Sequence, residues 1–176
     1  MKLYYETMES PIGPLTITVD KKCVVRIDYG TPAHLEKSWK KWADRYLHAA
    51  RFVHQPDCAQ QVKDELTDYF HGSRRYFTFA ITLYGTPFQR HVWEALVDTI
   101  PFGDTTSYKS IAIAIGNAQA VRAVGGAVNK NPLSIVVPCH RVIGANGKMV
   151  GYNGGLDKKI YLLKHEKKIC AEMLQK

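Results

Sequence analysis

The spacing of apolar residues changes near Gly85, and this change requires the two halves of the chain to fold differently. In the first half, apolar and polar residues alternate in short runs separated by stretches of helical spacing. This pattern is typical of a small α/β domain. The expected strands and helices are, in chain order, a strand at 15–19, a strand at 23–27, a helix at 33–49, a helix at 57–70 ending before Gly72, and a strand at 77–81.

The second half opens with a strong helix-start signal. Thr86 is placed as the N-cap, Pro87 as the first helical residue, and Gln89 as the residue that closes a capping box. We therefore predict a domain boundary just before this helix. Residues 1–84 form an N-terminal, structural domain, and residues 85–176 form a C-terminal domain that carries the chemistry.

Two short helices follow, at about 108–115 and 118–128, with Asn117 as the expected N-cap of the second. Helices joined by a tight turn in this way resemble a helix-turn-helix. Inside the second helix, Gly125 and Gly126 each cost about 1 kcal/mol relative to alanine. Either another helix packs closely against this face, or a ligand approaches its backbone.

The positive charge is distributed unevenly along the chain. Residues 1–85 carry twelve Lys/Arg and ten Asp/Glu, a net of +2, whereas residues 86–176 carry twelve and six, a net of +6. Such an excess attracts nucleic acid, although a solvated basic surface has the same composition. No apolar run reaches the roughly 18 residues of a membrane span, and the N-terminus does not resemble a signal peptide. We expect a cytoplasmic protein, or a nuclear one if the source is eukaryotic.

One of the four cysteines lies in a reactive setting. Cys23, Cys58, Cys139 and Cys170 form no CxxC pair, which favours reduced thiols. The apolar run 133–137 is predicted to be a buried strand that ends at Pro138, directly before Cys139. Neighbouring His140 and Arg141 are expected to favour the thiolate. The alternatives are an inert buried cysteine, or the nucleophile of a cysteine hydrolase or thiol redox enzyme.

The motifs around this cysteine resemble those of the O6-alkylguanine-DNA alkyltransferases. The resemblance covers about residues 86–166, with its motifs in the family's order. It rests on Phe88-Gln89, Val92-Trp93, Ser107-Tyr108, 121–127, Asn131-Pro132, 138–143, 151–156 and 162–166. It implies an α+β fold, in which a small N-terminal α/β (RNase H-like) domain precedes a helical, winged-helix-like C-terminal domain with a helix-turn-helix.

The resemblance also implies the reaction and its residues. The alkyl group of O6-alkylguanine, with O4-alkylthymine left open, would pass irreversibly to the sulfur in direct-reversal DNA repair. This is a methylated-DNA–protein-cysteine S-methyltransferase activity of one turnover per molecule. The implied catalytic residues are Cys139 as nucleophile, His140 as base through a water, Glu166 orienting His140, Asn131 bracing the turn, Tyr108 as donor, and Lys159 near the pocket.

For DNA, the resemblance implies minor-groove binding and base flipping, with Arg122 entering the base stack. The other residues implied to contact DNA are Ala120, Ala123, Gly125, Gly126, Ala127, Ser107 and Tyr108. The residues implied to form the substrate pocket are Val142, Tyr152, Asn153, Gly154 and Gly155.

The expected partner is double-stranded DNA carrying alkylated guanine, bound by a monomer, with cooperative binding left open. No cofactor and no membrane are expected. Some members bind zinc in the N-terminal half, but the spacing of the candidate ligands here predicts no structural zinc. Those candidates are Cys23, Cys58, His34, His48, His54 and His71. A lesion-binding protein without chemistry is the alternative function, and the cysteine at position 139 disfavours it.

Overall fold

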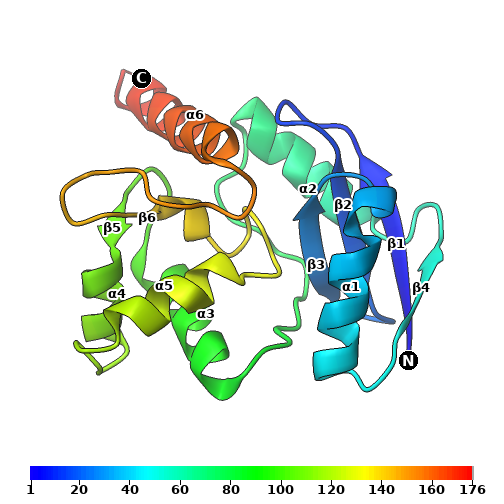
Figure 1. The fold of residues 1–176 in the computed structure, drawn as a ribbon. Coiled ribbons are helices and arrows are strands. Elements are labelled where there is room, and N and C mark those ends of the chain that lie inside the picture. The colour runs from blue at the N-terminus through cyan, green and yellow to red at the C-terminus, as the bar shows by residue number, and fades with distance from the viewer. Residues whose placement is uncertain (176) are drawn as a thin grey trace. The chain divides into compact units, whose positions relative to one another are not determined.

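The computed structural model describes residues 1–175 and divides the chain into two compact units, one of residues 1–84 and one beginning at Gly85 (Figure 1). The first unit holds a four-stranded sheet and two helices. Its strands are β1 (Lys2–Met8), β2 (Leu15–Val19), β3 (Val24–Tyr29) and β4 (Arg51–His54), and its helices are α1 (Pro32–Tyr46) and α2 (Gln60–His71). The sheet order is β3-β2-β1-β4, with β1 and β4 parallel and the other pairs antiparallel.

The two helices cover opposite faces of this sheet. Leu3 of β1 joins a buried cluster with Trp42 of α1, whereas the Glu6 carboxylate accepts a hydrogen bond from Ala59 N at the start of α2 (2.7 Å). Residues 3 and 6 point to opposite faces because side chains alternate along a strand. All five residues of β2 are therefore buried, as expected for a strand covered on both sides.

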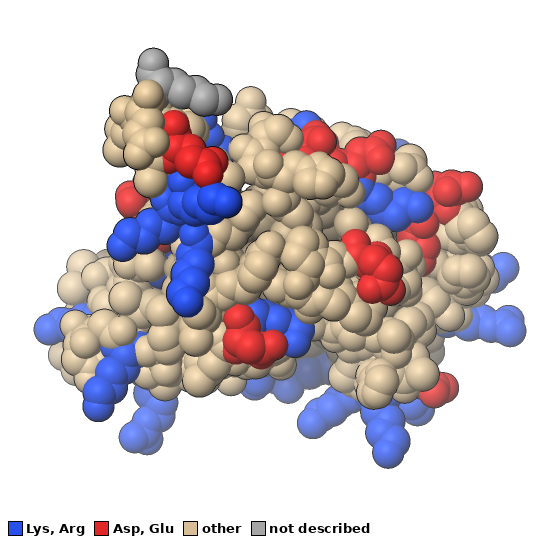
Figure 2. All heavy atoms as spheres, turned by 90° about the horizontal axis from the view of Figure 1, so that it is seen from above, with Lys and Arg blue, Asp and Glu red and all other residues tan. Residues whose placement is uncertain are grey.

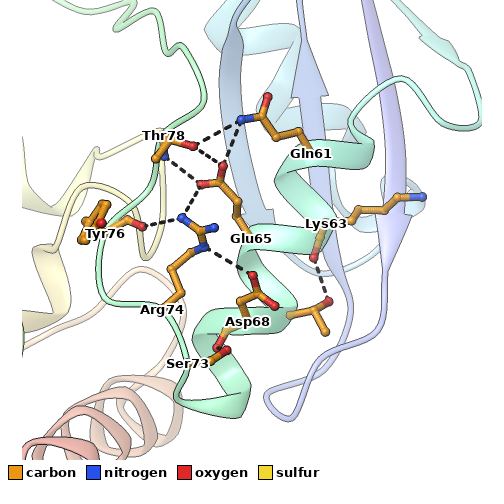
Figure 3. A network of polar contacts seen from close by, with 9 residues as sticks. Gln61, Lys63, Glu65, Asp68, Ser73, Arg74, Tyr76 and Thr78 are labelled. Atoms are coloured by element: carbon orange, nitrogen blue, oxygen red, sulfur yellow. Dashed lines mark hydrogen bonds and ion pairs between the residues drawn. The ribbon is translucent and has the colours of Figure 1, made fainter.

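The predicted strand at 77–81 is wrong, because only one residue of it pairs. Ile81 forms an isolated bridge with Val24 of β3. Ahead of it, the buried Glu65 of α2 accepts a hydrogen bond from Thr78 N (2.7 Å) and another from the Thr78 hydroxyl (Figure 3). Arg74 lies 3.5 Å from the same carboxylate. A side chain of α2 thus takes the amide that a strand would use in a ladder.

The second unit is mostly helical. Its elements are α3 (Pro87–Thr99), β5 (Thr106–Ser107), α4 (Tyr108–Ala114), α5 (Val121–Asn129), a 3₁₀ turn at Cys139–Arg141, β6 (Val142–Ile143) and α6 (Leu156–Leu174). Figure 1 shows the short parallel β5–β6 ladder between α6 and the group of α3, α4 and α5. None of the helices described is long and apolar enough to cross a membrane.

The sequence signals for helix starts and ends correctly predicted the start of α3 and the end of α2, but not the start of α5. The capping box is confirmed, since Gln89 N donates to the Thr86 hydroxyl (3.2 Å) and Thr86 N donates to Gln89 Oε1 (2.9 Å). Gly72 ends α2 in the left-handed conformation, also as predicted. The N-cap prediction for Asn117 is wrong: α5 begins three residues later than expected, after Ala120, because residues 115–120 are used in the turn between the helices.

Candidate active site

Cys139 is presented by a buried turn rather than by the end of a strand. The predicted strand at 133–137 is wrong: Val137 N donates to Leu133 O (2.9 Å), and Ile135 has a φ of 73°. The Asn131 amide group donates to Val137 O (2.9 Å), and its oxygen accepts from Leu133 N (2.9 Å). An apolar run has the same composition in a buried turn and in a buried strand, and here a side chain supplies the backbone partners.

The Cys139 thiol is buried, with 5% of the residue exposed. Asn131 Nδ2 donates to the sulfur (3.0 Å), and the Tyr152 side chain makes a second hydrogen bond to it. Burial raises the pKa of Cys139 above its ordinary value, against these two hydrogen bonds and the charge of Lys159, which lower it. Lys159 lowers the pKa of the thiol, whereas Arg141, which was expected to favour the thiolate, pairs with Glu166.

His140 and Glu166 form a fully buried pair. Both are 0% exposed, and His140 Nε2 lies 2.7 Å from Glu166 Oε1. Burial lowers the pKa of His140, although the contact with Glu166 opposes the change. Burial alone would raise the pKa of Glu166, but the hydrogen bonds and charges of His140 and Arg141 outweigh it and hold that pKa far below its ordinary value. His140 Nδ1 is also buried and has no hydrogen-bond partner among residues 1–175.

Arg141 and Gly103 also contact Glu166. Arg141 Nε donates to Glu166 Oε2 (2.8 Å), and Arg141 Nη2 donates to Oε1 (3.0 Å). Gly103 N donates to Oε2 (3.2 Å). The place of Arg141 directly after Cys139-His140 marks it as a candidate site residue in the sequence. Nothing in the sequence links Gly103 to a carboxylate 63 residues away.

Lys159 is a buried cation whose charge acts on the thiol. Its Nζ donates to Val142 O (2.5 Å) and lies 3.4 Å from Val150 O, so it joins the two ends of the intervening loop. Burial lowers the pKa of Lys159, and Cys139 acts in the opposite direction. An ammonium group near the thiol favours a negative charge on the sulfur.

Tyr108 connects the thiol to the helix-turn-helix. Its pKa is raised by burial and by the nearby Cys139. A Cβ atom added to Gly125 of α5 would lie 3.8 Å from the Tyr108 ring, which is ordinary contact. Pairing of Ser107 with Ile143 holds the start of α4 next to the segment that follows Cys139.

The exposed face of α5 carries three of the eight predicted DNA contacts. Arg122, Ala123 and Gly126 are exposed, and a Cβ atom on Gly126 would meet nothing within 4 Å. A packed neighbouring helix therefore does not account for Gly126. The prediction that Ala127 contacts DNA is wrong, because Ala127 is only 1% exposed and its carbonyl accepts a hydrogen bond from Trp93 Nε1 of α3 (2.8 Å). Of the other predicted contacts here, Gly125 of α5 and Ala120, the N-cap residue before α5, are both half-buried.

The glycines of the predicted pocket precede α6. Asn153 is exposed, and Gly154 and Gly155 are half-buried. Gly155 has a φ of 95° and occupies the N-cap position of α6, so a backbone conformation that favours glycine accounts for this residue.

On the face shown in Figure 2, acidic side chains stand beside many of the basic ones, so the excess charge does not form a uniform basic surface there. Residues 1–175 contain no group of three or more potential metal-ligating side chains.

Comparisons with known proteins identify the family of both parts of the chain. Residues 87–168 match the model for the 6-O-methylguanine DNA methyltransferase DNA-binding domain, and residues 3–83 match that for its ribonuclease-like domain. The methylated-DNA–protein-cysteine methyltransferase of Methanosarcina barkeri is 40% identical over 93% of this chain and 97% of its own. The constitutive Bacillus subtilis protein of the same name is 39% identical over 93% and 95%.

Solved structures give the same result over both units. The crystal structure of Mycobacterium tuberculosis OGT in complex with DNA matches with a TM-score of 0.81 and 38% identity, covering 96% of this chain and 94% of that one. The O6-methylguanine-DNA methyltransferase from Pyrococcus kodakaraensis matches with a TM-score of 0.70 and 28% identity, covering 93% and 98%. The predicted α+β fold is confirmed, and the chain belongs to the 6-O-methylguanine DNA methyltransferase family.

Proposed function

We propose that this chain repairs double-stranded DNA by transferring the alkyl group of O6-alkylguanine to Cys139. The observation that carries the proposal is the convergence of a buried thiol, a buried cation and a buried His140–Glu166 pair within one site. The product is a thioether, which water does not readily cleave, so each molecule acts once. The reaction requires no metal, nucleotide or methyl-donor cofactor.

The raised pKa of Cys139 means that its proton must be removed as the reaction proceeds. The proton leaves the sulfur for His140 Nδ1, through a water as the family resemblance implies. The sulfur then forms a bond to the alkyl carbon while the bond between that carbon and guanine O6 breaks, and the electron pair leaves with the guanine. Tyr108 donates a hydrogen bond to the departing base. The base takes up one proton from water to become neutral guanine, and the imidazolium ion of His140 releases one proton to water. This is nucleophile, base and orienting carboxylate applied to a thiol.

Lys159 and Asn131 support this step by stabilising the developing thiolate. The ammonium group of Lys159 lowers the pKa of the thiol, and the Asn131 amide donates directly to the sulfur. Hydrogen bonds to the charged form of an acid favour that form. We assign both residues to the stabilisation of the thiolate, and Asn131 also to the support of the turn.

DNA binding is assigned to α5. The target carbon lies inside the duplex, so the base must be flipped out. The minor groove is only about 6 Å wide, which suits the small exposed residues of α5. Arg122 on the same exposed face would fill the space left in the base stack. Residues 85–176 thus form the DNA-binding and alkyl-acceptor domain, and residues 1–84 have a structural role.

Mass spectrometry tests the transfer directly. The protein is incubated with duplex DNA containing O6-methylguanine, and intact and peptide masses are measured. One added methyl group on the Cys139 peptide, and none in Cys139→Ser, is the expected result. Binding of the lesion without a mass gain would instead support the non-catalytic, lesion-binding alternative. A duplex with O4-methylthymine in the same assay decides whether that base is a substrate.

Base flipping needs a separate comparison. Arg122→Ala should slow transfer from duplex DNA more than transfer from free O6-benzylguanine, because only the duplex requires the base to be extruded. Equal slowing with both substrates would remove the flipping role assigned to Arg122.

A further inference from the structure

The Glu166 carboxylate is surrounded by donors on both oxygens. Oε1 lies 2.7 Å from His140 Nε2 and accepts from Arg141 Nη2 (3.0 Å), and Oε2 accepts from Arg141 Nε (2.8 Å) and Gly103 N (3.2 Å). Glu166 is 0% exposed, so these groups take the place of water around the anion. A carboxylate with both oxygens so occupied acts only as an acceptor.

Arg141 is itself held in place from both sides. Its Nη1 donates to Ile100 O (2.9 Å), and its guanidinium carbon lies 5.6 Å from the centre of the Phe102 ring. The next residue, Gly103, has a φ of 86°, and a Cβ atom there would overlap Cys170 Sγ. The chain segment 100–103 therefore fixes the arginine with two contacts and supplies an amide to the same carboxylate.

We propose that Arg141, together with the Gly103 amide, is a positioning residue that keeps the His140 proton on Nε2 and leaves Nδ1 as the proton acceptor. This inference rests on the proposed role of Cys139 as alkyl acceptor. A neutral imidazole has one donor nitrogen and one acceptor nitrogen. Because the carboxylate facing Nε2 accepts only, Nε2 is the donor, and the buried Nδ1 is the nitrogen with a free electron pair.

The charge of Arg141 prevents His140 from taking a second proton before the thiol gives one up. The charged groups that act on His140 are Glu166 and Lys159 of α6 and Arg141 of its own turn, with the Cys139 thiol adjacent in the chain. Glu166 favours the imidazolium ion, and the two cations disfavour it. An imidazolium ion cannot accept a proton from a thiol, so a Glu166 charge that Arg141 did not balance would disable the base.

Loss of Arg141 should therefore raise the pKa of His140. The sign follows from the charges: removing a cation stabilises the protonated ring, so protonation persists to higher pH. The transfer rate falls at low pH because the base becomes protonated, and we call this fall the acid limb. The pH of the acid limb should rise by the same amount as the pKa of His140. A neighbouring charge typically shifts a pKa by about 1 unit or more.

Nuclear magnetic resonance of the full chain, labelled with ¹⁵N-histidine, tests this assignment. The chain has seven histidines, and comparison with a His140→Gln spectrum identifies the ring of interest. In the wild-type protein at neutral pH, Nε2 should carry the proton and Nδ1 should not. In Arg141→Met, the titration midpoint of His140 and the acid limb of transfer from free O6-benzylguanine should both move upward by about 1 pH unit.

Arg26→Met is the matched control. Arg26 is similarly buried and also binds a carboxylate through two nitrogens, that of Asp28, but it lies in the unit of residues 1–84. Its loss removes a comparable ion pair and should leave the His140 midpoint and the acid limb unchanged. Arg141→Lys, which keeps the charge, should restore most of the wild-type behaviour. Should Arg141→Met fail to fold, Arg141→Gln decides, since it removes the charge and retains an N–H donor.

A proton on Nδ1 of wild-type His140 would overturn the inference. The inference would also be overturned if the uncharged Arg141 variants had the same His140 midpoint and the same acid limb as Arg26→Met. Failure of the proposed function has a different signature, because wild-type protein would then gain no mass from O6-methylguanine DNA, while the His140 spectrum would still report its proton.

Discussion

Gly126→Ala should stabilise the free protein and impair repair of duplex DNA. Gly126 lies inside α5 at an exposed position where an added Cβ atom would meet nothing within 4 Å. The substitution therefore costs no packing energy and removes the conformational freedom of a glycine, which raises the free energy of unfolding by about 0.5–1 kcal/mol. On a helix, Arg122 and Ala123 precede it by four and three residues and share its face. The new methyl group thus enters the surface assigned to DNA.

The cost on DNA follows from the crowding of an extra methyl group against a narrow groove. Overpacking of a close contact costs about 1–3 kcal/mol, which corresponds to a roughly 5- to 150-fold weaker interaction. Urea unfolding followed by circular dichroism measures the first effect, and single-turnover transfer from methylated duplex measures the second. Transfer from free O6-benzylguanine should fall far less.

Gly116→Ala is the control for this experiment. A Cβ atom on Gly116 also meets nothing within 4 Å, but its φ of 77° is unfavourable for alanine, so this variant should lose about 1 kcal/mol of stability. Destabilisation by Gly126→Ala, or duplex repair as fast as that of the wild type, would refute the argument that Gly126 is kept for its approach to a ligand.

Three further predictions concern the buried site. Gly103→Ala should lower the free energy of unfolding by about 2–4 kcal/mol, because Gly103 has a positive φ and the new Cβ atom would overlap Cys170. In urea titrations, Cys170→Ala in the same chain should recover the part of this loss that comes from the overlap. If the effects of the two substitutions on stability simply add, the prediction is wrong. Glu166 has a folded-state pKa below its ordinary 4.5, so its stabilisation is present above that value and is lost as the pH falls through the lowered pKa. The stability gap between wild type and Glu166→Gln should therefore narrow on acidification, and a constant gap would disprove it. Lys159→Met removes a charge that lowers the pKa of Cys139, so thiol alkylation by iodoacetamide should require a pH higher by on the order of one unit, and an unchanged pH profile would exclude this role.

Structural features that depend only on a few neighbouring residues could be predicted from the sequence. The Thr86 capping box needs only residues three apart, and the left-handed Gly72 needs only the end of its own helix. Asn117 failed as an N-cap because the turn that precedes α5 uses its backbone: Asn117 N donates to Ala112 O, and Ala120 N donates to Asn117 O. The preference of asparagine for caps does not reveal which turn the chain closes.

The two failed strands have a common physical cause. Alternating or continuous apolar residues show that a segment is buried, but they do not show what satisfies its backbone groups. At 77–81 the Glu65 carboxylate of α2 takes the Thr78 amide, and at 133–137 the Asn131 side chain bonds the backbone. In both places a side chain from outside the run replaced the neighbouring strand that the pattern assumed.

The amino-acid sequence shows the motifs in their order, and the family resemblance of these motifs is what singles out Cys139, His140 and Glu166. The protonation states of these groups depend on three-dimensional surroundings. Burial and partners distant along the chain decide that the pKa of the thiol is raised, that Lys159 acts against this rise, and that Arg141 acts on Glu166. Charge interactions and desolvation depend on distance in space, and that distance is established only when the turn around Cys139 packs against α6.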